Sequence, residues 1–263
     1  MFKKIYLGLI LFFLYAPILV LMVFSFNASR SRATWGGFTL DWYRALFNDP
    51  NIMAALRNTV LIAVLSALMA TVIGTFAAVG INRMAPRSKR VVLAFNNLPV
   101  TTPDIVMGVS LMILFIYVIR GLGIGGLGFG TLLIAHITFN IPFVILSVMP
   151  RLRRLDGNLY EAALDLGSSP LYAFFRVILP EISPGIITGA MLAFTLSVDD
   201  FMVSFFTTGS GVSNLSIMIF SMARRGVNPR INALSTIIFI VVLALLYLIN
   251  IRDQRSAKKR DEG

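Results

Sequence analysis

Six long apolar runs restrict what this sequence can fold into. They lie approximately at Ile5–Phe26, Thr59–Ile81, Val92–Ile119, Thr131–Met149, Pro184–Phe206 and Ile231–Ile251. A helix needs about 20 residues to cross the roughly 30 Å of hydrocarbon in a bilayer, so each run can span a membrane. The strands of a membrane barrel alternate apolar with polar residues, which these runs do not. The sequence therefore predicts an all-α polytopic membrane protein, with six transmembrane helices in one domain over residues 1–263.

The positive charge is distributed unevenly over the segments between these runs. Fifteen of the 23 lysines and arginines lie at the two termini and in the segments that follow the second and fourth runs. Because cytoplasmic loops carry an excess of Lys and Arg, we expect both termini and the loop 151–182 to face the cytoplasm. The net charge of +11 is spread over short loops and the tail. Anionic lipid headgroups explain that distribution better than nucleic acid does.

Several features argue against catalysis by this chain. It has no cysteine, which excludes disulfides, thiol catalysis and cysteine-based metal sites. No P-loop motif occurs, so ATP hydrolysis would need another subunit. Two overlapping G-x-G-x-x-G matches, within Gly121–Gly128, lie between predicted membrane helices and lack the βαβ context of a dinucleotide site. We expect no catalytic residue, no metal and no cofactor.

A polar segment with helix punctuation separates the fourth and fifth runs. Asn158 is followed three residues later by Glu161, which is the spacing of a capping box and predicts a helix from Leu159. Gly167 is expected to end that helix. A simpler alternative is that Glu161 only caps its own helix.

A second short helix is predicted directly after the first. Ser169 is a good N-cap, Pro170 suits the first helical position, and Pro180 is expected to close the helix. Two short helices joined by a sharp turn form a stiff element that can dock on a partner.

The run from Asn158 to Pro180 resembles the cytoplasmic loop of ABC-importer permeases. The likeness rests on Glu161–Ala163, on Gly167 four residues later, and on the closing Leu179-Pro180. In that family the loop is a coupling helix that sits in a groove of the ATPase subunit. The resemblance implies that the residues coupled to the ATPase are Glu161, Ala162, Ala163, Asp165 and Gly167.

Three carboxylates fall inside the predicted spans. Asp104 lies in the third run, and Asp199 and Asp200 lie in the fifth. An aspartate at the centre of a membrane helix costs about 2.5–3.5 kcal/mol on insertion, so these side chains should face a cavity or a partner. Pro99 and Pro103 precede the first of them. Because proline frees helix carbonyls, we expect a kinked, partly hydrated segment there.

A stripe of small residues marks one face of the fifth run. Gly185, Gly189, Ala193 and Ser197 recur every four residues and would let another helix approach closely. If the helix is unbroken, Asp200 returns to within about 20° of this stripe and Asp199 points to one side. The alternative for the acid pair is capping of a helix end, or an ion pair with Arg224 or Arg225.

Two segments around these acids are similar to the polyamine permeases. They are Pro103–Gly108 and Phe194–Asp200, and the likeness to the second permease subunit of the spermidine/putrescine ABC importer extends from about Tyr6 to the end of the sixth run. A polyamine is a chain of ammonium groups, which spaced carboxylates can bind. The resemblance therefore implies a substrate path through Asp104, Asp199 and Asp200.

The same resemblance implies the partners and the location of the chain. It predicts a second, related permease subunit, two ATPase subunits and an extracytoplasmic binding protein, in a bacterial cytoplasmic (inner) membrane. Transport would proceed by alternating access, with ATPase closure pushing the coupling helix.

Other interpretations remain open from sequence alone. His136, the only histidine, could relay protons in a stand-alone secondary transporter, although a neutral histidine bonded to a neighbouring helix is the favoured alternative. An ABC permease for a sugar or ferric ion would keep the architecture and change only the substrate. The external segment from Asn27 to Arg57, with Trp35 and Trp42, is either a short amphipathic helix on the bilayer or a platform for the binding protein.

Overall fold

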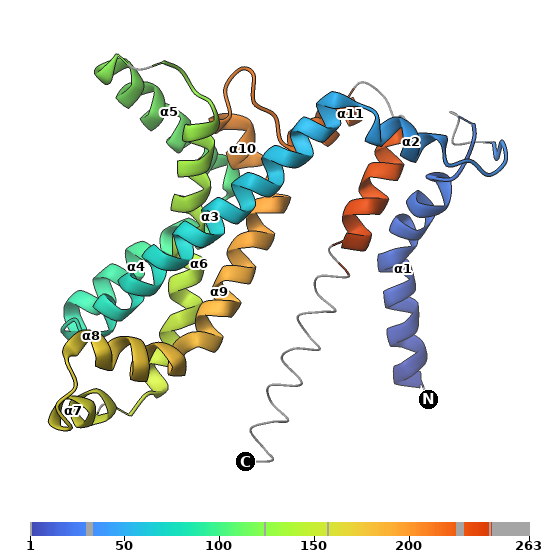
Figure 1. The fold of residues 1–263 in the computed structure, drawn as a ribbon. Coiled ribbons are helices and arrows are strands. Elements are labelled where there is room, and N and C mark those ends of the chain that lie inside the picture. Colours follow the sequence, from blue (N-terminus) through green and yellow to red (C-terminus); the bar gives the residue numbers. More distant parts are fainter. Residues whose placement is uncertain are drawn as a thin grey trace. The chain divides into compact units, whose positions relative to one another are not determined.

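The computed structural model describes residues 2–29, 34–123, 125–156, 158–224, 229–241 and 243. The described part is almost entirely helical, with one isolated bridge between Asn27 and Phe38. The helices, drawn in Figure 1, are α1 (Phe2–Phe24), α2 (Asp41–Phe47), α3 (Pro50–Asn82), α4 (Pro86–Thr101), α5 (Asp104–Leu122), α6 (Phe129–Arg154), α7 (Asn158–Asp165), α8 (Pro170–Ala173), the π-helix η1 (Phe174–Ile178), α9 (Leu179–Asp199), α10 (Met202–Thr207) and α11 (Leu215–Arg224).

Five helices among the described residues are long and apolar enough to cross a membrane. They are Ile5–Phe24, Pro50–Asn82, Asp104–Leu122, Phe129–Arg154 and Pro170–Asp199. Each overlaps one of the first five predicted runs. The sixth run begins in an apolar helix, Pro229–Val241, and continues beyond the described residues. The fold is that of an all-α polytopic membrane protein.

The chain forms two compact units, Met1–Met53 with Met218–Gly263 and Ala54–Ile217. In the first unit, Asn27 organises the segment after α1. Its side-chain oxygen accepts hydrogen bonds from the backbone of Gly36 (2.7 Å) and Ser29 (3.1 Å), and its carbonyl accepts one from the Trp42 indole (2.8 Å). Among the described residues of the predicted external segment there is one short helix, α2, and α3 begins at Pro50, before the predicted end at Arg57.

In the second unit, the small-residue stripe of α9 packs on α6 (Figure 1). A Cβ added at Gly189 would lie 3.2 Å from Val144 Cα, and one at Gly185 would lie 2.9 Å from the Ser147 carbonyl oxygen. From the opposite direction, a Cβ at Gly74 of α3 would lie 2.8 Å from Val144 Cβ. The predicted close approach is confirmed, and its partner is α6.

The third predicted run is divided into two helices. α4 ends at Thr101, Thr102 is extended with ψ 138°, and Pro103 leads into α5. The cause is local, because a residue before proline is driven out of the helical region. The Thr102 hydroxyl donates to the Leu98 carbonyl at 2.7 Å, which satisfies one of the carbonyls at the end of α4.

The fifth run departs from the prediction at both ends. Helix continues from Pro170 to Asp199, so the prediction that Pro180 closes a short helix is wrong. The π-turn of η1 lies just before the proline, and the Leu179 amide bonds to the Phe174 carbonyl, five residues back. The wider turn gives room where a proline ring would otherwise clash with a carbonyl. At the far end, Asp200 is extended (ψ 126°) and separates α9 from α10.

Candidate functional site

The two helix breaks adjoin in the second unit. α5 packs against α10 so closely that a Cβ at Gly108 would lie 2.9 Å from both the Met202 carbonyl oxygen and the Phe206 ring. Asp104 lies one helical turn before Gly108, and Asp200 lies two residues before Met202. Asp104 thus lies at the start of α5, and Asp199 and Asp200 lie at the end of α9, just before α10. Half-helices that meet in this way are typical of transporter binding sites.

The three acids have different surroundings. Asp104, in the first turn of α5, is exposed, and Asp199, the last residue of α9, is also exposed. The C-terminus of a helix carries partial negative charge. The carboxylate of Asp199 therefore adds to the negative potential at the end of α9.

Asp200 caps the first turn of α10 from the residue before its N-cap position, Phe201. Its carboxylate oxygens accept hydrogen bonds from the backbone amides of Val203 (3.2 Å) and Ser204 (2.7 Å) in the first turn of α10. The side chain is only 5% exposed, and one oxygen lies 3.6 Å from His136 Nε2. The capping alternative thus describes the contacts of Asp200. The ion-pair alternative stays open, since Arg224 belongs to the other compact unit and Arg225 lies outside the described residues.

His136 lies at the centre of a buried chain of polar side chains. Its Nδ1 lies 2.6 Å from the Ser197 hydroxyl, and its Nε2 lies 2.9 Å from the Ser204 hydroxyl. Ser197 continues to Ser66 at 3.1 Å, and Ser204 accepts from the Asn214 amide at 2.7 Å. His136 is therefore hydrogen-bonded to neighbouring helices, as the favoured alternative predicted. Its partners lie far apart along the chain, so no sequence spacing revealed the chain of contacts.

The predicted coupling helix is present as α7. It begins at Asn158, one residue earlier than predicted, and the Asp156 side chain accepts a hydrogen bond from the Asn158 amide (3.0 Å). Gly167 ends the helix with φ +82°, as predicted, and the Ser168 amide reaches back to the Ala163 carbonyl (3.1 Å). The Ser169 cap and Pro170 at the start of α8 are also confirmed.

α7 presents a surface with both charged and apolar residues. Glu161, Ala162, Asp165 and Gly167 are exposed, whereas Ala163 is buried against the rest of the unit. The apolar side chains that follow are exposed as well, and they are Leu166 (88%), Leu171 (72%) and Tyr172 (57%). Large apolar side chains exposed close together in sequence are suited to a protein interface.

The loop also contacts the end of α3. The guanidinium carbon of Arg83 lies 4.6 Å from the centroid of the Tyr160 ring in α7. Phe174 of η1 stacks on Phe76 of α3, with centroids 5.9 Å apart. Leu159 and Tyr160 pack against the buried core of the unit. A displacement of α7 would therefore reach both α3 and, through η1, α9.

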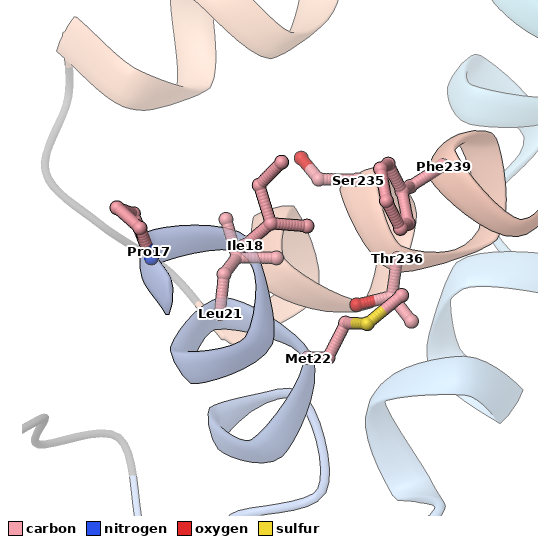
Figure 2. A pocket seen from close by; sticks show the side chains of 7 residues that line it. All are labelled: Pro17, Ile18, Leu21, Met22, Ser235, Thr236 and Phe239. Carbon is pink, nitrogen blue, oxygen red and sulfur yellow. The ribbon is translucent and has the colours of Figure 1, made fainter. Parts of the chain in front are cut away.

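A pocket in the first unit offers a different chemistry. It has a volume of about 280 Å³ and lies between α1 and the helix Pro229–Val241 (Figure 2). The lining residues are Pro17, Ile18, Leu21, Met22, Ser235, Thr236 and Phe239. The Thr236 hydroxyl donates to its own helix at the Asn232 carbonyl (2.7 Å). Since no carboxylate lines it, this pocket does not provide what a polycation requires.

Comparison with known proteins identifies relatives over most of the chain. The Escherichia coli (strain K12) protein described as "Spermidine/putrescine transport system permease protein PotC" is 41% identical over 251 residues, 95% of this chain and 92% of the relative. The same organism's "Putrescine transport system permease protein PotI" is 41% identical over 228 residues, 86% of this chain and 81% of the relative.

Solved structures share the fold at low sequence identity. A chain of the bacterial alginate ABC transporter aligns with a TM-score of 0.73 and 18% identity, covering 94% of this chain and 91% of that one. A chain of the MetNI methionine ABC transporter aligns with a TM-score of 0.62 and 20% identity, covering 79% and 98%. The model of the family "Binding-protein-dependent transport system inner membrane component" matches residues 70–260. The chain therefore belongs to this family of ABC-importer permeases.

Proposed function

We propose that this chain is a permease subunit through which an ATP-driven importer takes up a polyamine of the spermidine/putrescine type. The assignment of the substrate rests on the pair of exposed acids, Asp104 and Asp199, at two adjoining helix breaks. Spaced carboxylates form charge-assisted hydrogen bonds with ammonium groups. The names of the relatives from Escherichia coli favour the same substrate.

The energy comes from a separate ATPase subunit in this proposal. The exposed side chains of α7 and the apolar residues after it form the docking surface, and Gly167 sets the angle at which α8 leaves. ATPase closure displaces α7 and moves α3 and α9, which turns the path from outward-facing to inward-facing. A second permease and an extracytoplasmic binding protein complete the complex in the inner membrane, with both termini in the cytoplasm.

Reconstitution in proteoliposomes tests this function. The chain, co-purified with its ATPase, partner permease and binding protein, should accumulate labelled spermidine or putrescine only when ATP is supplied. The purified chain alone should neither hydrolyse ATP nor accumulate polyamine under a proton gradient. Proton-driven uptake by the chain alone would favour the secondary transporter. ATP-driven uptake of a sugar or ferric ion, without polyamine, would keep the ABC assignment and replace the substrate.

The contact between α7 and α3 gives a second prediction. Replacing Tyr160 with Leu removes the ring under Arg83 and should lower polyamine transported per ATP hydrolysed by about two- to fivefold, since a cation–π contact at an exposed site contributes about 0.5–1 kcal/mol. Tyr160→Phe keeps the ring and serves as the control. An equal loss of coupling in Tyr160→Phe would show that the ring face is not what transmits the movement.

A further inference from the structure

One arrangement of protons links the polar side chains around His136 in a continuous series of hydrogen bonds, called here the polar chain. Asn214 donates to the Ser204 hydroxyl, which donates to His136 Nε2. A proton on Nδ1 then donates to Ser197, whose hydroxyl donates to Ser66. The Ser66 hydroxyl finishes on the Ala63 carbonyl at 3.4 Å. A neutral histidine thus satisfies every hydroxyl and ring N–H donor in the polar chain, which then runs in one direction from Asn214 to Ala63.

This polar chain of side chains joins the helices that flank the α9/α10 break. Its members come from α3, α6, α9, α10 and the residue before α11. All are at most 2% exposed: Ser66, His136, Ser197, Ser204 and Asn214. Apolar burial gives little net attraction between helices in a bilayer, so packing and interhelical hydrogen bonds hold them together. The break in the fifth run is therefore fixed by partners from the rest of the unit.

Asp200 and Asp199 are adjacent in sequence but differ in their contacts and in their exposure. The carboxylate of Asp200 bonds to two backbone amides and lies beside His136, with little exposed surface. Asp199 is exposed at the end of α9. A polyamine ammonium can reach Asp199 without disturbing the fold, whereas reaching Asp200 would require breaking the α10 cap.

We infer that Asp200 and His136 are positioning residues that fix the α9/α10 break and thereby present Asp199 to the substrate. The inference rests on the proposed function, in which Asp199 contacts the polyamine. Capping needs an oxygen acceptor and not a charge, and Asn and Asp are about equally good N-caps. Binding an ammonium group depends on the charge. Asparagine at position 200 therefore separates the two roles.

The transport test compares uptake per assembled complex in three single variants and in the double variant that combines Asp200→Ala with His136→Ala. Asp200→Asn should change the apparent KM for spermidine by less than about twofold, because its amide oxygen keeps one of the two bonds to the α10 backbone and Asn caps helices about as well as Asp. Asp200→Ala removes the cap and should raise the KM by about fivefold or more. His136→Ala should also raise the KM. Combining it with Asp200→Ala should raise the KM no further, because both substitutions act on the α9/α10 break. A KM for Asp200→Asn that rises as far as that of Asp200→Ala would overturn the inference.

The geometry of the break can be measured without substrate. Because the chain has no cysteine, Asp199→Cys introduces a single thiol. Its rate of modification by a cationic thiol reagent, in the assembled complex, should change in the Asp200→Ala and His136→Ala backgrounds and stay the same with Asp200→Asn. Equal rates in all backgrounds would refute the positioning role. If His136→Ala fails to assemble, Ser197→Ala is measured in its place, because it removes one hydroxyl of the polar chain around His136.

These two readouts distinguish failure of the inference from failure of the proposed function. Altered thiol reactivity with a normal KM in Asp199→Asn would mean that the break is positioned as inferred but that Asp199 is not a polyamine contact. Normal thiol reactivity with a raised KM in Asp199→Asn would keep the polyamine path and remove the positioning role.

Discussion

Replacing Gly167 with proline should abolish polyamine uptake while the chain still inserts and assembles. Gly167 has φ +82°, and its amide donates to the Leu164 carbonyl at 2.8 Å. Proline fixes φ near −65° and has no amide hydrogen, so the turn between α7 and α8 cannot form. A proline misplaced in this way costs about 3 kcal/mol or more, which lowers the equilibrium constant for forming the turn by more than about a hundredfold. Uptake and substrate-stimulated ATP hydrolysis by the reconstituted complex measure the effect.

The matched control is Gly123→Pro. Gly123 is the C-cap of α5, has φ +65°, and donates its amide to the Ile119 carbonyl, so proline creates the same conflict at a helix end remote from α7 in sequence. This control should lower stability and keep uptake coupled to ATP hydrolysis. Equal loss of coupling in both variants would mean that general strain, and not the α7 turn, is responsible.

A charge reversal tests the same surface without changing the backbone. Glu161 is exposed, so Glu161→Lys should leave the fold intact while removing a docking charge. Full substrate-stimulated ATPase activity and full uptake in both Glu161→Lys and Gly167→Pro would remove the docking assignment of α7.

Local signals explain why the coupling loop could be predicted in detail. The end of α7 depends on Gly167, and the start of α8 depends on Ser169 and Pro170, all within a few residues of the turns that they form. The errors are local as well. The first helix begins at Asn158 instead of Leu159, and the π-turn lets the second helix pass through Pro180.

The helix break at Asp200 could not be placed from hydropathy. Residues 184–206 are apolar almost throughout, so a window average favours one continuous helix. The break at Asp200 depends on the side chain of His136, more than 60 residues earlier, and on Ser204 in the next helix. Such long-range contacts have no periodic signature. As a result, sequence identified the three acids but could not separate the exposed Asp199 from the buried Asp200.

Asn substitution at the two exposed acids should give the largest effect on substrate affinity. Asp104→Asn and Asp199→Asn keep the size of each side chain and remove its charge. A hydrogen bond to a charged group contributes about 1.5–3 kcal/mol, so each variant should weaken polyamine uptake by about ten- to a hundredfold. The matched control is Asp41→Asn in α2, an acid whose side chain is 78% exposed and which has no place in the proposed path.

A monoamine distinguishes direct contact of each acid with an ammonium group from attraction by a diffuse negative potential. If Asp104 and Asp199 bind different ammonium groups of one polyamine, their effects should add for putrescine. Inhibition of uptake by butylamine, which carries one ammonium group, should depend on only one of the two acids. A diffuse negative potential would instead make both acids matter equally for either amine. Unchanged uptake per assembled complex in both Asn variants would refute a cation path at these breaks, since neither exposed carboxylate would then replace water around the substrate.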